Sequence, residues 1–338
     1  MNLFSRHKVL LLLGFFLLFF TSSLYWFLFS PPSHDSLTRV IYIKKGLPLN
    51  KISAILEKEG IIKNRRFFVV LATLLGKKAE IKAGEYEFHT RMPPLEVLGI
   101  LVKGQVKPHL VTIVEGYTVN QIAQLLEEYN IVDRRAFLQK ASSPAFISSL
   151  DLPVESHFTL EGFLFPDTYH LFKEMDPEQV IQIMVRQFKK VFNPDLTNRA
   201  SQLGISQMET VILASIIEKE TAISEEKPII SAVFQNRLKK RIPLQSDPTV
   251  IYGIKNFDGN LTKEDLLTPS PYNTYLVNGL PPTPICNPGK DSILAALYPA
   301  PVPYLYFVSK NDGTHYFSAD IEEHNQAVWK YQKYPQKN

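Results

Sequence analysis

The sequence predicts an α+β protein made of an N-terminal transmembrane helix, two related strand–helix units and a mixed, loop-rich α+β domain. Three observations predict this arrangement: an uncharged apolar run near the N-terminus, an internal repeat, and a C-terminal half in which apolar helices alternate with loops rich in Pro, Tyr and Asn. A chain of 338 residues is long enough for two or three folded units. The expected boundaries are 1–8 before the membrane helix, 9–29 for that helix, 38–105 and 106–155 for the two repeat units, and 156–338 for the last domain.

The amino-acid composition and net charge limit the kinds of function that the protein can have. Hydrophobic residues make up 45% of the chain and charged residues 21%, which is typical of a globular protein. The net charge of +4 is too small and too dispersed to predict nucleic-acid binding, and it suits a surface that meets an anionic envelope polymer equally well. Cys286 is the single cysteine, so an internal disulfide is excluded. No Cys/His pattern has zinc spacing, and we expect neither a metal nor a cofactor.

Residues 9–29 predict a single-pass membrane anchor. The segment carries no charge, and its length matches the roughly 20 residues that a helix needs to cross the hydrocarbon core. Basic residues at 6–8 precede it, which places the N-terminus in the cytoplasm. We therefore expect the protein in the cell (inner) membrane, with the bulk of the chain on the periplasmic or extracytoplasmic side. The alternative is a signal peptide cleaved near residues 21–23. The apolar run continues past these small residues, which favours the anchor.

Two stretches match at an offset of 70 residues, one from Ile41 and one from Val111. Each copy begins with alternating apolar residues that predict a short strand, followed by a glycine that turns the chain. Asn50 and Asn120 are then expected to cap a helix whose apolar residues recur on one face. The recurring pairs are Ile43/Ile113, Gly46/Gly116, Asn50/Asn120, Ile52/Ile122, Leu56/Leu126, Glu57/Glu127, Ile61/Ile131, Arg65/Arg135 and Phe67/Phe137.

This strand–turn–helix pattern is similar to the LysM module, a small fold that often binds polymers containing N-acetylglucosamine. The resemblance implies that the repeat units contact such a polymer. The alternative is that they are spacers or docking modules without affinity for sugar, and both interpretations stay open.

The helix predicted from Gln207 carries the candidate catalytic residue. Ser206 and Glu209 have the spacing of a capping box, and residues 211–217 are apolar or small, so the helix is expected to be buried on all sides. Glu218 follows directly and shares a face with small residues. Apolar surroundings would raise the pKa of this carboxyl, which is what a general acid at a glycosidic oxygen requires.

The simpler alternative is that Glu218 is solvated surface at the end of a helix. Glu220 lies about 200° further round the same helix. Glu225 and Glu226 fall in a charged turn. We expect these three glutamates to be solvated surface.

The loops that follow are dense in Tyr, Asn, Gln, Thr and Pro, a mixture that suits a carbohydrate cleft better than a phosphate or metal site. Rings stack on sugar faces, amides and hydroxyls pair with sugar hydroxyls, and prolines hold the loops rigid. Asp247 is interpreted as a residue that orients Glu218 or the substrate. Packing of the loops alone is the alternative role for most of these residues. The candidate substrate contacts are Gln245, Asp247, Tyr252, Asn273, Tyr275 and Asn287.

Several motifs in this order resemble the endolytic murein transglycosylase, or YceG-like, family. They include residues 160–169 and 214–221 together with the apolar N-terminus and the repeat region. The resemblance implies a lyase that cleaves the β-1,4 bond between N-acetylmuramic acid and N-acetylglucosamine without water and leaves a 1,6-anhydro end. It implies that Glu218 is catalytic. The implied partners are peptidoglycan glycan strands, the membrane and cell-wall synthases.

One carboxyl is sufficient for this chemistry, because the C6 hydroxyl of the same sugar is the nucleophile. Glu218 would first donate a proton to the leaving oxygen and then accept one from that hydroxyl. An ordinary glycosidase needs a second carboxyl. The sequence offers Glu161, Asp167 or Asp247 for that role.

Two other classes of function are open from the sequence. A non-catalytic, membrane-anchored scaffold that binds peptidoglycan fits the anchor and the repeats equally well. A serine hydrolase using Ser246, Asp247 and His315 is conceivable, but the chain has no GxSxG elbow. A pyridoxal-phosphate lyase is disfavoured because no lysine has a persuasive Schiff-base setting.

Overall fold

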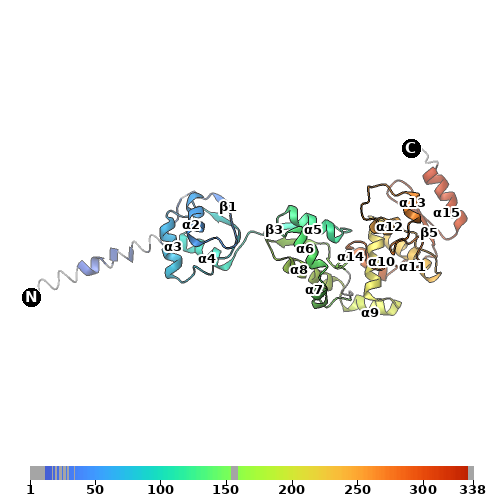
Figure 1. The fold of residues 1–338 in the computed structure, drawn as a ribbon, viewed down its shortest axis with the longest axis horizontal. Coiled ribbons are helices and arrows are strands. Elements are labelled where there is room, and N and C mark those ends of the chain that lie inside the picture. Colours follow the sequence, from blue (N-terminus) through green and yellow to red (C-terminus); the bar gives the residue numbers. More distant parts are fainter. Residues whose placement is uncertain are drawn as a thin grey trace, which may run out of the picture. The chain divides into compact units, whose positions relative to one another are not determined.

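The computed structural model describes residues 35–153 and 159–333 continuously, together with residues 12–16, 18, 19, 21, 22, 25, 28 and 30–33. The chain forms two compact units, one of residues 1–109 with 172–174 and one of residues 110–171 with 175–338 (Figure 1). Among the described residues, no helix has the length and apolar character needed to cross a membrane. Part of the predicted anchor at 9–29 lies outside the described residues.

The first unit is a two-stranded antiparallel sheet packed against three helices. Strand β1 (Thr38–Ile43) pairs with β2 (Gly84–His89), and Ile43 lies opposite Gly84. The helices are α2 (Leu49–Lys58), α3 (Arg65–Leu74) and α4 (Pro94–Lys103). The core is built from the alternate inward residues of the strands and one face of each helix. The predicted strand and helix of the first repeat are therefore present.

The predicted caps at Asn50 and Asn120 are wrong. Pro48 precedes the first residue of α2, and Thr118 precedes α5 (Val119–Glu128). Thr118 and Gln121 satisfy each other's backbone N–H groups in a capping box, so the helix begins before Asn120.

The second unit contains the rest of the chain. Strand β3 (His109–Thr112) pairs with β4 (Thr168–Leu171), and β5 (Tyr306–Ser309) pairs antiparallel with β6 (His315–Ser318). Its remaining helices are α6 (Arg134–Ala141), α7 (Pro144–Ser149), α8 (Pro177–Val191), α9 (Pro194–Leu203), α10 (Gln207–Glu220), α11 (Lys227–Lys239), α12 (Asp247–Gly253), α13 (Lys263–Leu267), α14 (Lys290–Leu297), α15 (Ile321–Val328) and a π-helical turn (Trp329–Lys333).

Two hydrophobic clusters form the core of this unit. The first surrounds the second repeat and runs from Val111 to Val185 on α8, so it continues past the boundary expected at residue 155. The second surrounds α10, which packs against α11 and α14.

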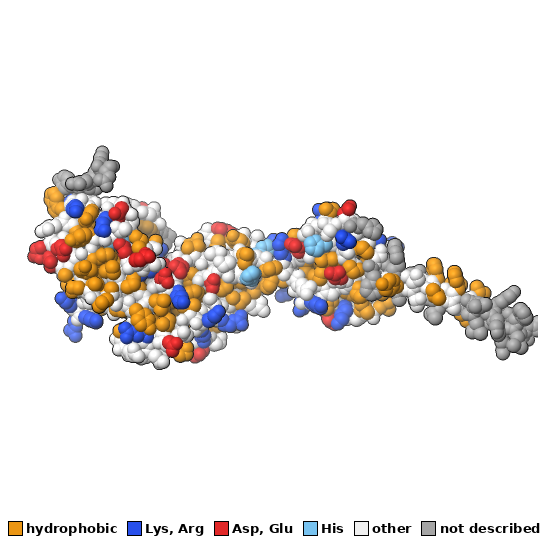
Figure 2. Space-filling model, turned by 180° about the vertical axis from the view of Figure 1, so that it is seen from behind, with side chains coloured by type: hydrophobic (Ala, Val, Ile, Leu, Met, Phe, Trp, Pro, Cys, Tyr) orange, Lys and Arg blue, Asp and Glu red, His pale blue; other side chains and the backbone are white. Residues whose placement is uncertain are grey.

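Helix α10 is the central element of the second cluster. Ser206 and Glu209 form the predicted capping box. Every residue from 211 to 217 is buried, as the all-apolar pattern predicts. The two glutamates at the end of this helix are therefore held on a rigid support. On the face of the molecule in Figure 2, acidic and basic side chains are interspersed with hydrophobic ones.

Candidate active site

The end of α10 presents two carboxyls in different directions. Glu218 and Glu220 are two residues apart, which on an α-helix is a rotation of about 200°. Glu218 faces the start of α14, whereas Glu220 lines a cavity between α10, α11, α12, β5, β6 and α15. The two side chains therefore have different environments.

Glu218 sits in an ion pair and not in the apolar setting that the sequence predicted. The ammonium of Lys227 donates to its two carboxylate oxygens at 3.2 and 3.3 Å. The backbone N–H of Gly289, at 2.9 Å, and the hydroxyl of Ser292, at 2.7 Å, both donate to its Oε2 atom. The side chains of Glu218 and Lys227 are 7% and 3% exposed. The apolar residues before Glu218 on α10 do not predict this, because Lys227, Gly289 and Ser292 come from later segments.

This arrangement suits a structural role for Glu218. A carboxylate at the start of α14 accepts otherwise unpaired N–H groups and interacts favourably with the helix dipole. Lys227 is also 4.0 Å from Glu115, whose side chain is half exposed. Burial and the charge of Glu218 raise the pKa of Glu115.

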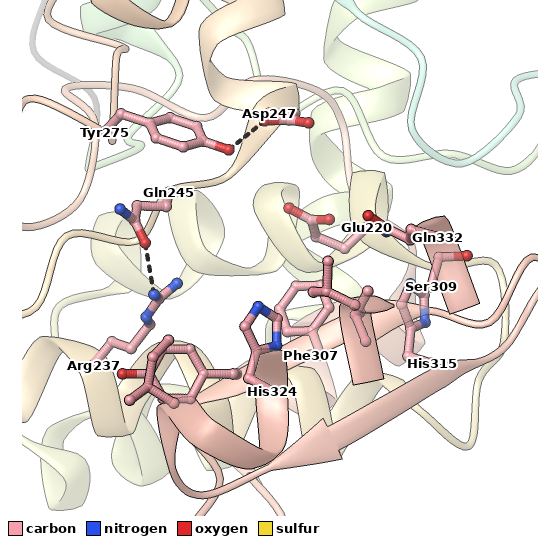
Figure 3. Close-up of a pocket in the computed structure, with 14 residues that line it drawn as sticks. Glu220, Arg237, Gln245, Asp247, Tyr275, Phe307, Ser309, His315, His324 and Gln332 are labelled. Carbon is pink, nitrogen blue, oxygen red and sulfur yellow. Dashed lines mark hydrogen bonds between the residues drawn. The ribbon is translucent and has the colours of Figure 1, made fainter. Parts of the chain in front are cut away.

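The side chain of Glu220 forms part of the cavity wall (Figure 3). The prediction that Glu220 is solvated surface is therefore wrong. The cavity has a volume of about 430 Å³. The hydroxyl of Ser246 donates to Glu220 Oε1 at 2.5 Å. Burial raises the pKa of Glu220 to about 7, and the charge of Asp247 adds to this effect, while the Ser246 hydrogen bond opposes it. A glutamic acid with this pKa keeps its proton in a substantial fraction of molecules at neutral pH.

A loop between α11 and α12 shapes the wall next to Glu220. Gln245 has a φ of 54°, in the left-handed region that is unusual for a residue other than glycine. Its backbone N–H donates to Thr274, and its side-chain oxygen accepts from Arg237 at 2.8 Å. The hydroxyl of Tyr275 donates to Asp247 at 2.6 Å. Three of the predicted substrate contacts, Gln245, Asp247 and Tyr275, therefore line the same cavity.

The other three predicted contacts hold the fold together and do not line this cavity. Asn273 is fully buried, and its amide donates to backbone carbonyls of residues 265, 266 and 268. Asn287 is fully buried and donates to Glu161, as does the hydroxyl of Tyr252. These side chains satisfy buried polar groups, which explains why polar residues are needed in these loops.

The three carboxyls considered as a second catalytic group also differ in whether they line the cavity. Glu161 is 3% exposed, and burial raises its pKa to about 8. Asp167 accepts from Gln187 at 2.6 Å and does not line the cavity. Asp247 alone among these three carboxyls lies with Glu220 in the cavity wall.

Ser246, Asp247 and His315, the residues considered for a serine hydrolase, do not form a catalytic triad. The hydroxyl of Ser246 donates to Glu220, and His315 is paired with Glu226, with 2.7 Å between Nδ1 and Oε2. Glu226 has only 12% of its side chain exposed, so the expectation that it is solvated surface is wrong, whereas Glu225 is exposed. Across residues 35–153 and 159–333, no cluster of three or more His, Cys, Asp or Glu side chains could hold a metal ion.

Three residues that line the cavity are not predicted from the sequence as site residues: Glu220, Arg237 and His324. The signal for Glu220 was its place at the end of an all-apolar helix, which it shares with Glu218. Sequence alone does not say which of the two faces a cavity, because the elements that enclose it come from residues 237 to 332.

Comparisons with known proteins agree over most of the chain. The model of the YceG-like family matches residues 41–330. The chain is 32% identical to a protein of Bacillus subtilis named endolytic murein transglycosylase, over 90% of this chain and 88% of that one. It is 31% identical to a protein of the same name from Streptococcus pneumoniae, over 85% of this chain and 58% of that one.

A crystal structure of a putative yceG-like protein from Listeria monocytogenes has the same fold. The TM-score is 0.59 at 34% sequence identity, and the match covers 86% of this chain and 99% of that one. With a family model that matches most of its length and relatives above 30% identity, this chain belongs to the YceG-like family.

Proposed function

We propose that this protein is a lytic murein transglycosylase that cleaves the bond between N-acetylmuramic acid and N-acetylglucosamine inside peptidoglycan strands. The names of the B. subtilis and S. pneumoniae relatives support this substrate and reaction. The observation that carries the proposal is a protonatable glutamate, Glu220, in the wall of a cavity that also presents Asp247, Tyr275 and Gln245.

Glu220 is the proton donor in this proposal, and Glu218, the donor that the resemblance to the family implies, is the alternative donor that the test below distinguishes from it. A general acid works best when its pKa is near the operating pH, and burial brings the pKa of Glu220 to about 7. The carboxyl group of Glu218 accepts hydrogen bonds from three donors, which are Lys227, Gly289 and Ser292. These contacts hold the side chain of Glu218 against α11 and α14, and it does not line the cavity.

The reaction then runs through one carboxyl. Glu220 donates its proton to the glycosidic oxygen as the bond to C1 of the muramoyl residue breaks. The resulting carboxylate accepts the proton of the C6 hydroxyl, which attacks C1 of the same ring and forms the 1,6-anhydro product. The C1–O bond to the leaving sugar is replaced by the C1–O6 bond, and Glu220 ends protonated as it began. Burial raises the pKa of Glu220, and the negative charge of Asp247 adds to this effect, so both favour the protonated form at the start.

Membrane attachment and partners belong to the same proposal. The uncharged segment at 9–29 anchors the chain with its N-terminus in the cytoplasm and both folded units outside. The LysM-like repeat of the first unit contacts the glycan, and cell-wall synthases supply the nascent strand. A non-catalytic scaffold that binds peptidoglycan is the competing function.

The test is digestion of purified sacculi, with mass spectrometry of the released glycan. The wild-type protein should release fragments with 1,6-anhydro ends. Glu220→Gln should reduce the rate by at least about 100-fold, since removal of a general acid typically costs this much. Glu218→Gln, assayed below the temperature at which it unfolds, should retain most of the activity.

The opposite pattern, with activity lost only in Glu218→Gln, would restore Glu218 as the proton donor. Release of reducing ends without the anhydro bridge would make the protein a hydrolase. No release by the wild-type protein, together with binding to sacculi, would favour the scaffold.

A further inference from the structure

Arg237 is a buried cation without an anionic partner in the part of the chain that the structure describes. It lies in the last turn of α11 and is 7% exposed. One terminal nitrogen donates to the carbonyl of Leu244 and the other to the side-chain oxygen of Gln245, both at 2.8 Å. Both acceptors are neutral. No carboxylate of the described residues forms an ion pair with it.

A buried charge of this kind is costly unless a counter-charge compensates it. Arginine stays protonated in proteins, so it does not escape the cost by losing its proton. Burial acts against the charged form of Arg237 and lowers its pKa. The guanidinium lies 5.4 Å from the centre of the Tyr306 ring, which compensates part of the charge.

Two donor or acceptor atoms at this wall have no partner. Across residues 35–153 and 159–333, the buried side-chain polar atoms without a hydrogen bond include Arg237 Nε and His324 Nδ1. Both residues line the cavity that Glu220 lines. Tyr306 joins them, because the imidazole of His324 stacks on its ring at 5.1 Å. Figure 3 shows Arg237 and Gln245 at the opposite side of the cavity from Glu220 and His315.

We infer that Arg237 binds a carboxylate of the glycan substrate in this cavity, with His324 as a second polar contact. The inference rests on the proposed function and specifies which part of the substrate is recognised. Arginine suits this task because its planar fork pairs with a carboxylate through two hydrogen bonds. N-Acetylmuramic acid differs from N-acetylglucosamine by a lactyl ether that ends in a carboxyl. That group is a free carboxylate in peptide-free glycan and an amide where a peptide is attached, and such a peptide carries carboxylates of its own.

The acidic groups in the cavity do not satisfy Arg237. Asp247 accepts a hydrogen bond from Tyr275, and Glu220 accepts one from Ser246. A substrate carboxylate at Arg237 would lie across the cavity from the proton donor. The muramoyl residue would therefore be oriented by its side group while its glycosidic oxygen faces Glu220.

Binding of soluble sugars to the full chain tests the inference directly. The probes are N-acetylmuramic acid, its uncharged methyl ester, N-acetylglucosamine and a muramoyl dipeptide with a free carboxylate, and the dissociation constants are measured by titration calorimetry or NMR. In the wild-type protein, the free acid should bind at least about tenfold tighter than its ester. Arg237→Gln should remove that difference.

Arg199→Gln is the matched control. Arg199 also donates to a backbone carbonyl, that of Leu297, and also lies over a tyrosine ring, that of Tyr298, but it does not line the cavity. Its variant should keep the preference for the acid. If Arg237→Gln does not fold, Arg237→Lys retains the charge without the fork and should keep only part of the preference.

The pattern of binding shows whether Arg237 recognises a carboxylate and, if so, which part of the substrate carries it. A preference for the acid that depends on Arg237 assigns the lactyl carboxylate. A preference that depends on Arg237 only for the dipeptide assigns the carboxylate of the peptide. Equal binding of acid and ester with no gain for the dipeptide, or no binding of any probe, overturns the inference. If the protein cleaves no glycan but still distinguishes the acid from the ester, the proposed reaction fails and the anion site stands.

Discussion

Replacing Glu218 with glutamine should lower the stability of the second unit by about 3 kcal/mol. The ammonium of Lys227 would remain buried, 3% exposed, with only the half-exposed Glu115 at 4.0 Å as a carboxylate neighbour. Removing one partner of a buried ion pair typically costs about 3–5 kcal/mol. The amide oxygen of glutamine still accepts from Gly289 or Ser292, which places the expected value at the lower end of this range. For a unit of this size, that corresponds to about 6–12 °C in Tm.

Scanning calorimetry of the full chain measures this shift. Glu225→Gln is the control, because Glu225 is exposed in the turn between α10 and α11, and its replacement should change stability by less than about 0.5 kcal/mol. Lys227→Met should destabilise on its own, whereas Glu218→Gln with Lys227→Met should recover part of the loss because no buried charge is left unpaired. If Glu218→Gln melts like the wild-type protein and yet is inactive, the structural role assigned to Glu218 is refuted.

Further predictions concern the packing, the cavity and the dependence of stability on pH. Gly162→Ala should destabilise by about 3 kcal/mol in chemical denaturation, because φ is +89° and an added Cβ would lie 2.5 Å from a proline ring; Gly204→Ala, at a φ of +73° with open space around it, should cost only about 1 kcal/mol. Tyr275→Phe should reduce cleavage of glycan about 3- to 10-fold at unchanged Tm, because Asp247 loses the hydrogen bond of 2.6 Å; an unchanged rate would remove Tyr275 from the site. Glu220→Gln should be more stable than the wild-type protein at high pH. The carboxyl has a pKa of 4.5 in the unfolded chain and about 7 in the folded one, so the wild-type protein loses stability as the pH rises between these values. At 1.36 kcal/mol per pKa unit the loss is up to about 3 kcal/mol. A difference in the free energy of unfolding between the variant and the wild type that is the same at pH 4 and pH 8 would contradict this.

The elements that local patterns control could be predicted from the sequence. Strand β1 follows from its alternating apolar residues, and the buried helix α10 follows from an uninterrupted apolar run behind a capping box. The cap of α5 was misplaced by two residues because both Thr118 and Asn120 are good caps, and the side chain of Gln121 decides between them.

The site could be predicted in part. Gln245, Asp247 and Tyr275 were identified by their loop chemistry and line the cavity, while Asn273 and Asn287 have the same chemistry but are used inside the fold. Composition does not distinguish these two uses, since a buried backbone carbonyl and a sugar hydroxyl need the same amide.

The environments of the two helix-end glutamates were beyond sequence reasoning for a related physical reason. The groups that surround Glu218 and Glu220 in the described part of the chain include Lys227, 9 residues beyond Glu218, and Gln332, 112 residues beyond Glu220. Their arrangement is a property of the folded chain and not of any local pattern.

The pH dependence of kcat/KM for glycan cleavage tests the role of Glu220 most directly, since it reports the ionisation of the free enzyme's catalytic acid. We expect the rate to fall as the pH rises through about 7, the pKa to which burial and Asp247 bring Glu220. Asp247→Asn should move this limb to lower pH, because the neighbouring charge that raises the pKa is removed. A rate that stays constant from pH 6 to pH 9, or a limb that Asp247→Asn does not move, would contradict the assignment of Glu220 as the proton donor.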